Sequence, residues 1–451
     1  MEIVKEDISS YIIDSVKLYP TALAVVRDVC RARPSGYKFM PRYRAGRWDG
    51  YISLMHSMTR FPTGLLNHVC YWLEKRNFSV DIVDTTKTLE FQYPKEDDLN
   101  GIMLRDYQMQ AVSMLLEAKR GIAKMATNSG KTEVMASIIK SMNMPKTLVV
   151  VHRKELMYQT AERFNTRLGI DVGLVGDGNH KFGVVTVAMI QTLHNMLKKL
   201  KLECSLVMID ECHTASSDTM LDVLKVVPGS YRFGFSGTPL KYSDLPDMKL
   251  MGATGEVIVD ISNDYLITSG YSAKPVINIH VIEDKDDTNW DMDYHSAYTQ
   301  LIVHNDKRNK LISNIAKQSV GVTLLLVNQI EHGKLLEELI PNSVFVHGSE
   351  DMTVRRSVLE MMRGSDARVY IASPIFDEGI DVPSIDTLIL AAGGKSNIKV
   401  LQRVGRGLRV KENGGGLCVH DFIDDTNKYL LEHSDARVAT YEKEKFKIIL
   451  A

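Results

Sequence analysis

The stretch GIAKMATNSGKTEVMASIIKSM, residues 121–142, decides the fold of this 451-residue chain. Its apolar beginning, residues 121–126, predicts a buried strand, and residues 133–142 have the pattern of a helix. The tight loop ATNSGKT, residues 126–132, joins the two. A loop that leads from a strand into the start of a helix directs several backbone N–H groups at an anion. The sequence therefore predicts a phosphate site here.

The residue types in this loop suit a nucleoside triphosphate. Gly130 lets the backbone approach the phosphates closely, Lys131 supplies a cation for the β- and γ-phosphates, and Thr132 offers a hydroxyl to Mg²⁺. The loop departs from the strict GxxxxGK[ST] pattern, because Met125 replaces the first glycine. Asn128 replaces another glycine of many such loops, and asparagine tolerates a positive φ. A chance Ser-Gly-Lys-Thr turn is the alternative.

A second motif, SLVMIDECH, ends a predicted buried strand with Asp210 and Glu211. An acid at a strand end beside a phosphate loop can hold Mg²⁺, and the next carboxylate can orient or deprotonate the attacking water. Two adjacent carboxylates repel each other unless a cation lies beside them. A solvated acidic turn is the alternative, but the acid pair and the phosphate loop together favour an NTPase that uses ATP and Mg²⁺.

A third motif, QRVGRGLRV at residues 402–410, carries two arginines. Arg406 and Arg409 are three residues apart, so on a helix they share one face. Two guanidinium groups on one face suit a developing phosphoryl charge. A basic, solvated helix is the alternative. If these arginines and Lys131 contact one nucleotide, the gap between their domains must close with ATP and reopen after hydrolysis.

The order of the predicted elements indicates three parts. Short apolar runs alternate with helical patterns in two successive segments, which predicts βαβ units and parallel sheets. The polar, turn-rich residues 93–101 read as a linker. We therefore expect a small α/β N-terminal domain (1–98) for DNA recognition, then two tandem α/β domains (99–272 and 273–451).

Composition is that of an ordinary globular protein, with 44% hydrophobic and 25% charged residues and a formal net charge of −1. No apolar run is long enough to span a membrane, and the acidic N-terminus is unlike a signal peptide. The five cysteines form no CxxC pair, so neither a zinc site nor a disulfide framework is indicated. A reducing cytoplasm is the expected location.

The stretch RARPSGYKFMPRYRAGRWDG, residues 31–50, is locally basic. Residues 27–47 hold six arginines and one lysine against a single acid. Its prolines and glycines exclude one continuous helix, so we expect a loop or twisted hairpin. Arg42, Arg44 and Arg47 are expected to contact DNA phosphates. The interleaved rings either stack on bases or form the core of the small domain, and we favour the core. These rings are Tyr37, Phe39, Trp48 and Tyr51.

The ordered motifs of residues 102–451 resemble the superfamily 2 helicase core with its two RecA-like domains. Together with the N-terminal stretch, they resemble most the UvsW-like bacteriophage helicases. In this resemblance LRDYQ is the element upstream of the phosphate loop, VVVHRKELMYQT is motif Ia, VVTVAMIQTL motif Ib, DECH motif II, SGTP motif III, ASPIFDEGIDVP motif V and QRVGRGLR motif VI. The implied nucleotide contacts are Gln108 to adenine, and Asn128, Ser129, Gly379 and Asp381. The implied nucleic-acid contacts are Arg153, Thr186 and Ser373.

The resemblance implies an ATP- and Mg²⁺-dependent DNA helicase that unwinds forks and migrates Holliday junctions in replication, recombination or repair. It implies a monomer in the host cytoplasm, with branched or single-stranded DNA and replication or recombination proteins as partners. Glu378, Gly237 and the DECH sequence depart from the DEAD-box RNA helicases. An RNA helicase, a duplex translocase that does not separate strands, and a non-enzymatic annealing or junction-binding protein are the alternatives.

Overall fold

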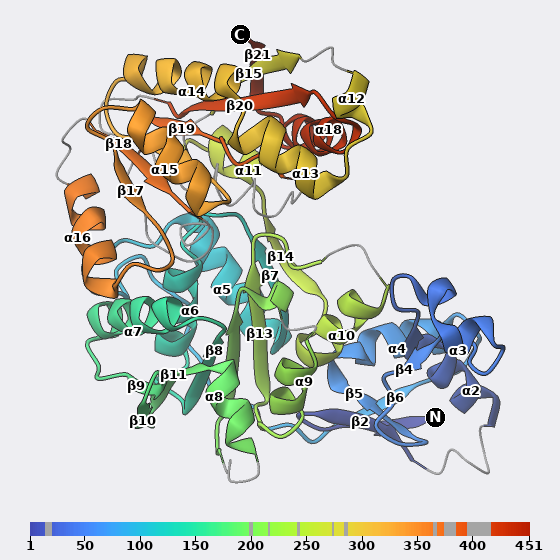
Figure 1. The fold of residues 1–451 in the computed structure, drawn as a ribbon. Helices are drawn as coiled ribbons and strands as arrows, with labels where there is room; N and C mark the ends of the chain where they lie inside the picture. The colour runs from blue at the N-terminus through green and yellow to red at the C-terminus, as the bar shows by residue number, and fades with distance from the viewer. Residues whose placement is uncertain are drawn as a thin grey trace. The chain divides into compact units, whose positions relative to one another are not determined.

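The computed structural model describes residues 1–13, 20–197, 202–214, 217–240, 244–272, 275–283, 287–363, 368–373, 385–394 and 416–451. The chain divides into two compact units, Met1–Ile261 and Ser262–Ala451. Each unit is built around a parallel sheet flanked by helices (Figure 1), and the first also contains a small N-terminal layer. The predicted α/β fold class, with tandem parallel sheets after a small α/β domain, is confirmed.

The N-terminal layer is a four-stranded sheet in the order β5-β2-β1-β6, with two helices packed on it. The β1–β6 pair is parallel and the other pairs are antiparallel. Its core consists of apolar side chains such as Ile3, Val26 and Val69, which are fully buried. The elements are β1 (Glu2–Lys5), β2 (Ser9–Ile12), α2 (Pro20–Val29), β5 (Arg60–Pro62), α4 (Leu66–Glu74) and β6 (Asp81–Asp84).

The basic stretch forms an excursion, residues 33–51, between two short antiparallel strands, β3 (Arg31–Ala32) and β4 (Ile52–Ser53). Inside it lie a 3-10 turn, η1 (Tyr37–Phe39), and one helical turn, α3 (Pro41–Arg44). The predicted absence of a continuous helix is confirmed.

The expectation that the rings of the basic excursion form a core was wrong. Phe39 is 74% exposed, and Tyr37, Trp48 and Tyr51 are only half-buried. The excursion lies outside the apolar core of the N-terminal layer, so its rings pack against arginine side chains and not against that core. The Arg33 guanidinium lies 4.6 Å from the Tyr37 ring centre and 4.3 Å from that of Tyr51.

An eight-stranded sheet forms the rest of the first unit, in the order β10-β9-β11-β8-β12-β13-β7-β14. Every pair is parallel except β10 with β9. Strands buried on both faces are nearly continuous apolar runs, which is why TLVVV and LVMID predicted them. The strands are β7 (Arg120–Met125), β8 (Thr147–Val151), β9 (Gly173–Gly176), β10 (Asn179–Lys181), β11 (Val185–Met189), β12 (Leu206–Asp210), β13 (Tyr231–Ser236) and β14 (Val257–Ile261). The helices are α5 (Asp106–Ala118), α6 (Lys131–Ser141), α7 (Lys154–Leu168), α8 (Ile190–Asn195), α9 (Asp218–Leu224) and α10 (Asp244–Thr254).

The second unit is a seven-stranded, wholly parallel sheet in the order β17-β18-β16-β19-β20-β15-β21. Strand β20, which lies between β19 and β15, carries two buried carboxylates. Asp424 pairs with Arg308 at 2.8 Å, and Asp421 pairs with Arg437 at 2.9 Å. The strands are β15 (Val276–Glu283), β16 (Thr323–Leu326), β17 (Val344–Val346), β18 (Val369–Ala372), β19 (Thr387–Ile389), β20 (Cys418–Asp425) and β21 (Lys447–Leu450). The helical segments are α11 (Asn263–Thr268), α12 (Asp287–Trp290), α13 (Tyr294–Tyr298), η5 (Thr299–Val303), α14 (Asp306–Gln318), α15 (Ile330–Leu339), α16 (Met352–Arg363) and α18 (Lys428–Lys443).

The N-terminal layer packs tightly on the eight-stranded sheet. A Cβ at Gly64 would lie 2.0 Å from the carbonyl oxygen of Met251 in α10, so only glycine allows this approach. Arg120, the first residue of β7, donates hydrogen bonds to the carbonyls of Asp7 and Ala253. One buried guanidinium thus joins the layer to the sheet.

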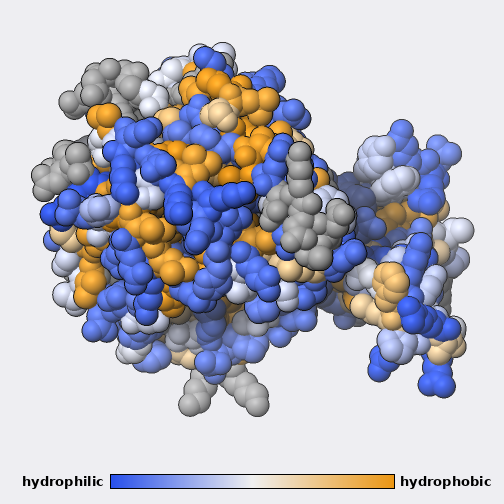
Figure 2. Space-filling view, turned by 45° about the horizontal axis from the view of Figure 1, so that its top comes forward, coloured by the Kyte–Doolittle hydropathy of each residue, from blue (hydrophilic) through white to orange (hydrophobic). Residues whose placement is uncertain are grey.

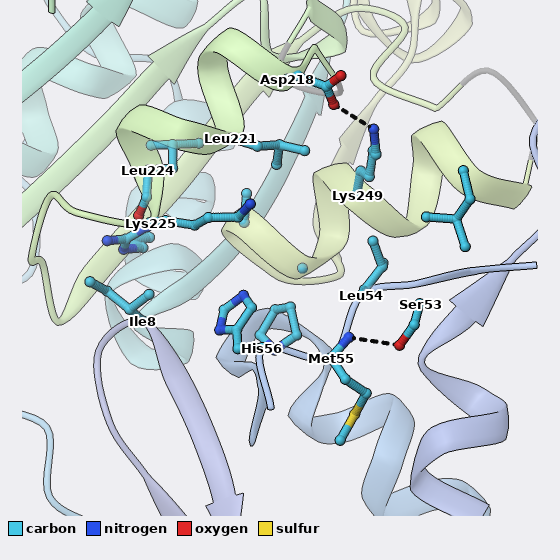
Figure 3. Close-up of a pocket in the computed structure, with 15 residues that line it drawn as sticks. Ile8, Ser53, Leu54, Met55, His56, Asp218, Leu221, Leu224, Lys225 and Lys249 are labelled. Carbon is cyan, nitrogen blue, oxygen red and sulfur yellow. Dashed lines mark hydrogen bonds and ion pairs between the residues drawn. The ribbon is translucent and has the colours of Figure 1, made fainter. Parts of the chain in front are cut away.

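A cavity of about 260 Å³ remains beside this contact. Figure 3 shows Ile8, Leu54 and Met55 on one side and Leu221 and Leu224 of α9 on the other. The cavity has mostly apolar walls, with the ion pair between Lys249 and Asp218 (2.8 Å) at one end. None of the residues of the phosphate loop lines it.

Hydrophilic side chains cover much of the face seen in Figure 2, with apolar groups gathered in patches between them. Among the described residues, no helix combines the length and the apolar character that crossing a membrane requires.

Substitution of Gly64 by alanine is expected to weaken this packing. The added methyl group meets backbone, which cannot rotate away, so we expect unfolding of the first unit to become easier by about 1–3 kcal/mol. Thermal unfolding and proteolysis between the layer and the sheet would measure this. Gly348→Ala is the control, because its Cβ meets no atom within 4 Å. Equal stability of both variants would contradict the prediction.

Candidate nucleotide site

The predicted phosphate loop connects the end of β7 to the start of α6. Asn128 has φ 69° and Gly130 has φ 77°, so the loop closes through two left-handed residues, and the expected positive φ of Asn128 is confirmed. Lys131 and Thr132 open α6, with Gly130 as its N-cap. The first backbone N–H groups of a helix have no partner within the helix, so they are available to an anion.

Gln108 in α5 lies directly over this loop. Its side-chain amide donates to the carbonyl of Ser129 (2.9 Å) and accepts from the backbone N–H of Arg105 (2.9 Å). The Tyr107 hydroxyl donates to the same Ser129 carbonyl at 2.9 Å. Gly130 has a left-handed φ of 77°, which strains a residue with a side chain, and a Cβ there would also displace the Gln108 amide, so glycine is favoured at this position. Gln108 therefore positions the loop, and its contact with adenine stays a prediction.

The acid pair lies at the same edge of the sheet as the loop. Strand β12 ends at Asp210, and both β7 and β12 belong to the parallel set, so their carboxyl ends share one edge. The Lys131 ammonium is 4.0 Å from the Glu211 carboxylate, and both side chains are 15% exposed. The ammonium also lies 3.5 Å from the carbonyl of Met125. The structure thus brings together the lysine and the acids that the sequence predicted.

Asp210 and Glu211 have opposite electrostatic environments. Asp210 is 7% exposed, and burial together with the neighbouring Glu211 charge raises the pKa of its carboxyl. Burial tends to raise the pKa of the Glu211 carboxyl too, but the effects of the Lys131 ammonium and of His213 are larger, and the net result is a lowered pKa. Glu211 has φ 48°, a strained value for a residue with a side chain. The strain and the two carboxylates mark this turn as a functional one.

A contact that sequence reasoning missed joins the DECH turn to the SGTP segment after β13. Ser236 Oγ donates to Glu211 at 3.3 Å and lies 3.1 Å from His213 Nδ1. The His213 Nδ1 atom is also 3.3 Å from the Glu211 carboxylate. The sequence did contain a sign of this contact, because both motifs stand at the ends of predicted strands. Strands β12 and β13 are neighbours in the sheet, so their ends lie side by side.

The site fits a nucleotide with Mg²⁺. The Ser129 hydroxyl is buried and has no hydrogen-bond partner in the described part of the chain, and Asp210 is a buried carboxylate whose charged form a cation would stabilise. Among the described residues, no group of three or more His, Cys, Asp or Glu side chains could hold a metal. Mg²⁺ at nucleotide sites is typically bound by one or two carboxylates together with the substrate phosphates.

Arg153 is the N-cap of α7, where the chain leaves β8. Nearby, the exposed Gln191 of α8 donates to the carbonyl of His152 at 3.3 Å. Gln191 was not predicted, although it comes two residues after the strand VTVAM and so lies at the same edge of the sheet. It is a better-placed candidate for a polynucleotide contact than Thr186.

The expectation for Thr186 is corrected, because this residue is buried within β11. Its hydroxyl accepts from the backbone N–H of Gly183 (3.0 Å) and donates to the Gly183 carbonyl (3.2 Å), so it is not presented to DNA. Ser373, which follows β18, is buried. Four predicted site residues lie outside the described residues, namely Gly379, Asp381, Arg406 and Arg409.

Comparison with known families matches three parts of the chain. Residues 8–83 match "DNA helicase UvsW, N-terminal", residues 101–241 match "Type III restriction enzyme, res subunit", and residues 306–411 match "Helicase conserved C-terminal domain". The ATP-dependent DNA helicase uvsW of Enterobacteria phage T4 is 26% identical over 474 residues, covering 94% of each chain. The chain belongs to the UvsW-like superfamily 2 helicases. As such, it is an ATP-dependent DNA helicase.

Other relatives share the helicase core. The DNA 3'-5' translocase XPB2 of Sulfurisphaera tokodaii is 25% identical and matches 76% of this chain and 85% of its own length. Among solved structures, S. cerevisiae Dbp5 bound to RNA and ADP BeF3 has a TM-score of 0.58 at 14% identity, covering 78% of this chain and 90% of that one. At such low identity this structural likeness supports the fold of the UvsW-like core.

Lys131→Ala is expected to lower ATP turnover by about 100-fold or more, because it removes the cation opposite the phosphates. The variant should stay folded, but its thermal unfolding midpoint should fall, because the Asp210 and Glu211 carboxylates lose the ammonium beside them. Phosphate release with and without DNA would measure the effect. Lys124→Ala is the control, since its surface ion pair with Asp260 contributes little. DNA-stimulated hydrolysis near the wild-type rate in Lys131→Ala would contradict the assignment.

Proposed function

We propose that this helicase acts on branched DNA, unwinding forks and migrating Holliday junctions. The observation that carries the proposal is the UvsW-type N-terminal layer, packed directly on the sheet whose edge holds Lys131, Asp210 and Glu211. A DNA-binding layer attached to a nucleotide site supplies what a branch-directed motor requires. The phage relative named above supports the choice of DNA over RNA.

In the proposed mechanism the first unit binds the nucleotide through the phosphate loop. Lys131 would neutralise the phosphates, and Thr132 and Asp210 would hold Mg²⁺, which would supply electrostatic stabilisation of the phosphate charge. Glu211, kept ionised by its cationic neighbours, orients and deprotonates the attacking water. Ser236 and His213 hold the Glu211 carboxylate in place.

The second sheet would complete the site with Arg406 and Arg409, whose guanidinium groups suit the transition-state charge. We keep the three-part division 1–98, 99–272 and 273–451 for this mechanism. ATP would draw the two sheets together, and hydrolysis would release them, so that Arg153 and Gln191 grip one DNA strand and release it in turn. We propose that the protein works as a monomer in the cytoplasm of a bacterial host.

The basic excursion is proposed to bind the duplex arms at the branch. Arg42, Arg44 and Arg47 are exposed and follow one another around α3. Their joint replacement by alanine should weaken fork binding and reduce its salt dependence by about 0.9 in log–log slope per lost phosphate contact. Fluorescence anisotropy at several salt concentrations would measure both.

The matched control removes three exposed lysines outside the N-terminal layer. These are Lys140, Lys310 and Lys317. Basal ATP turnover without DNA should be the same in both variants. Equal fork affinities of the arginine variant and the wild type at moderate salt would contradict the proposed role.

Strand displacement on defined substrates tests the function itself. Four-way junctions, forks with either tail polarity, RNA duplexes and blunt DNA duplexes would be compared with ATP present. We expect junctions and forks to be resolved, and Lys131→Ala to be inactive. Preferential unwinding of RNA, translocation without strand separation, or junction annealing that is unaffected by loss of ATP would each replace the proposal with one of the alternatives.

A further inference from the structure

Helix α4 of the N-terminal layer has an outer face that the mechanism above does not use. Leu66, Val69 and Leu73 form its buried side. At 100° per residue, three residues of α4 and the two residues that follow its last turn occupy one continuous arc, which runs from the side opposite the buried side round to its flank. These are Tyr71, Lys75, His68, Trp72 and Arg76. The arc combines two large rings with cationic side chains.

The rings on this arc are unusually open to solvent. Tyr71 is 52% exposed and Trp72 is 38% exposed. Lys75 Nζ lies 5.5 Å from the centre of the Tyr71 ring, and the Arg76 guanidinium lies 5.6 Å from that of Trp72. The two rings meet edge to face, with centres 5.5 Å apart. The result is a pair of non-parallel ring surfaces, each with a cation beside it.

The charges around the arc favour an anionic ligand. Glu74 is the acid within α4, and at 300° from Tyr71 it lies outside the arc. Glu256, which precedes β14, places a negative charge near His68. Lys75 and Arg76 follow the last residue of the helix, whereas His68 lies in its first turn. The open rings and the two cations therefore point to a ligand with both flat, apolar faces and negative charge.

We propose that the outer face of α4 binds unpaired DNA, with bases stacked on Trp72 and Tyr71 and phosphates paired with Lys75 and Arg76. Stacking on exposed rings beside basic residues is the general mode by which single strands are bound without sequence preference. The inference rests on the proposed function, because a branch-directed helicase generates unpaired strands at the junction. It assigns one of these strands to α4, outside the basic excursion.

Trp72 provides a direct readout of stacking. The chain has three tryptophans, and replacing Trp48 and Trp290 by phenylalanine leaves Trp72 as the only one. Addition of an oligothymidylate to this variant should quench the Trp72 fluorescence to saturation, whereas a blunt duplex of equal charge should quench it far less. A residue with a merely structural role would show no such quenching. Circular dichroism would verify that the variant is folded.

Substitutions on α4 provide the second measurement. Trp72→Ala should lower the affinity for the oligothymidylate about tenfold, and Trp72→Phe should restore most of it. Lys75→Glu with Arg76→Glu should also weaken binding and reduce its salt dependence by about 0.7 per lost phosphate contact. The control of equal charge change is Lys140→Glu with Lys317→Glu, which should bind like the wild type.

Several outcomes would overturn the inference. These are an unquenched Trp72 at saturating oligothymidylate, equal quenching by the duplex, unchanged affinity of Trp72→Ala, or equal weakening by the control pair. The failure of the proposed function is a separate result, since it would appear as the absence of DNA-stimulated ATP hydrolysis in the wild type. Junction activity without binding at α4 would reject only the present inference.

Discussion

Two adjacent carboxylates in a protein interior are the constraint on which the first unit depends. Asp210 is buried, and Glu211 follows it in a strained conformation. Such a pair is unfavourable unless cations lie beside it. Lys131, from a loop about 80 residues earlier in the chain, supplies the nearest permanent positive charge. A parallel sheet makes this possible, because it delivers the ends of β7 and β12 to one edge.

Strand β7 connects two functions. Its first residue, Arg120, donates to backbone carbonyls of the N-terminal layer and of α10, and its last residue, Met125, leads into the phosphate loop. The layer with its DNA-directed side chains is therefore joined to the nucleotide site by a single buried strand. Gly64 strengthens this connection, because the absence of a Cβ lets the layer contact the backbone of α10.

Local chemistry explains why the phosphate loop and the acid pair could be predicted. Their residue types have few other reasons to occur between a buried strand and a helix, and Asn128 takes the backbone conformation that its side chain tolerates. The prediction that Thr186 contacts DNA was wrong, because it rested on the resemblance of its strand to a helicase motif. In the structure Thr186 is buried, and its hydroxyl is hydrogen-bonded to the backbone of Gly183. The rings of the basic excursion were misjudged for the opposite reason. Their hydrophobicity suggested a core, but the excursion lies beyond the apolar layer and arginines pack against them.

The sequence by itself determined the fold class, the nucleotide loop, the acid pair and the basic stretch, because each depends on residue types at short spacing along the chain. Only the tertiary structure decided that Gln108 lies over the loop, that Ser236 and His213 meet Glu211, and that Arg120 joins the N-terminal layer to β7. It also decided that Tyr71 and Trp72 face solvent, whereas Leu73 beside them is buried. These contacts join residues far apart in the chain or depend on which face of a helix is covered. Sequence patterns over a few residues contain neither kind of information.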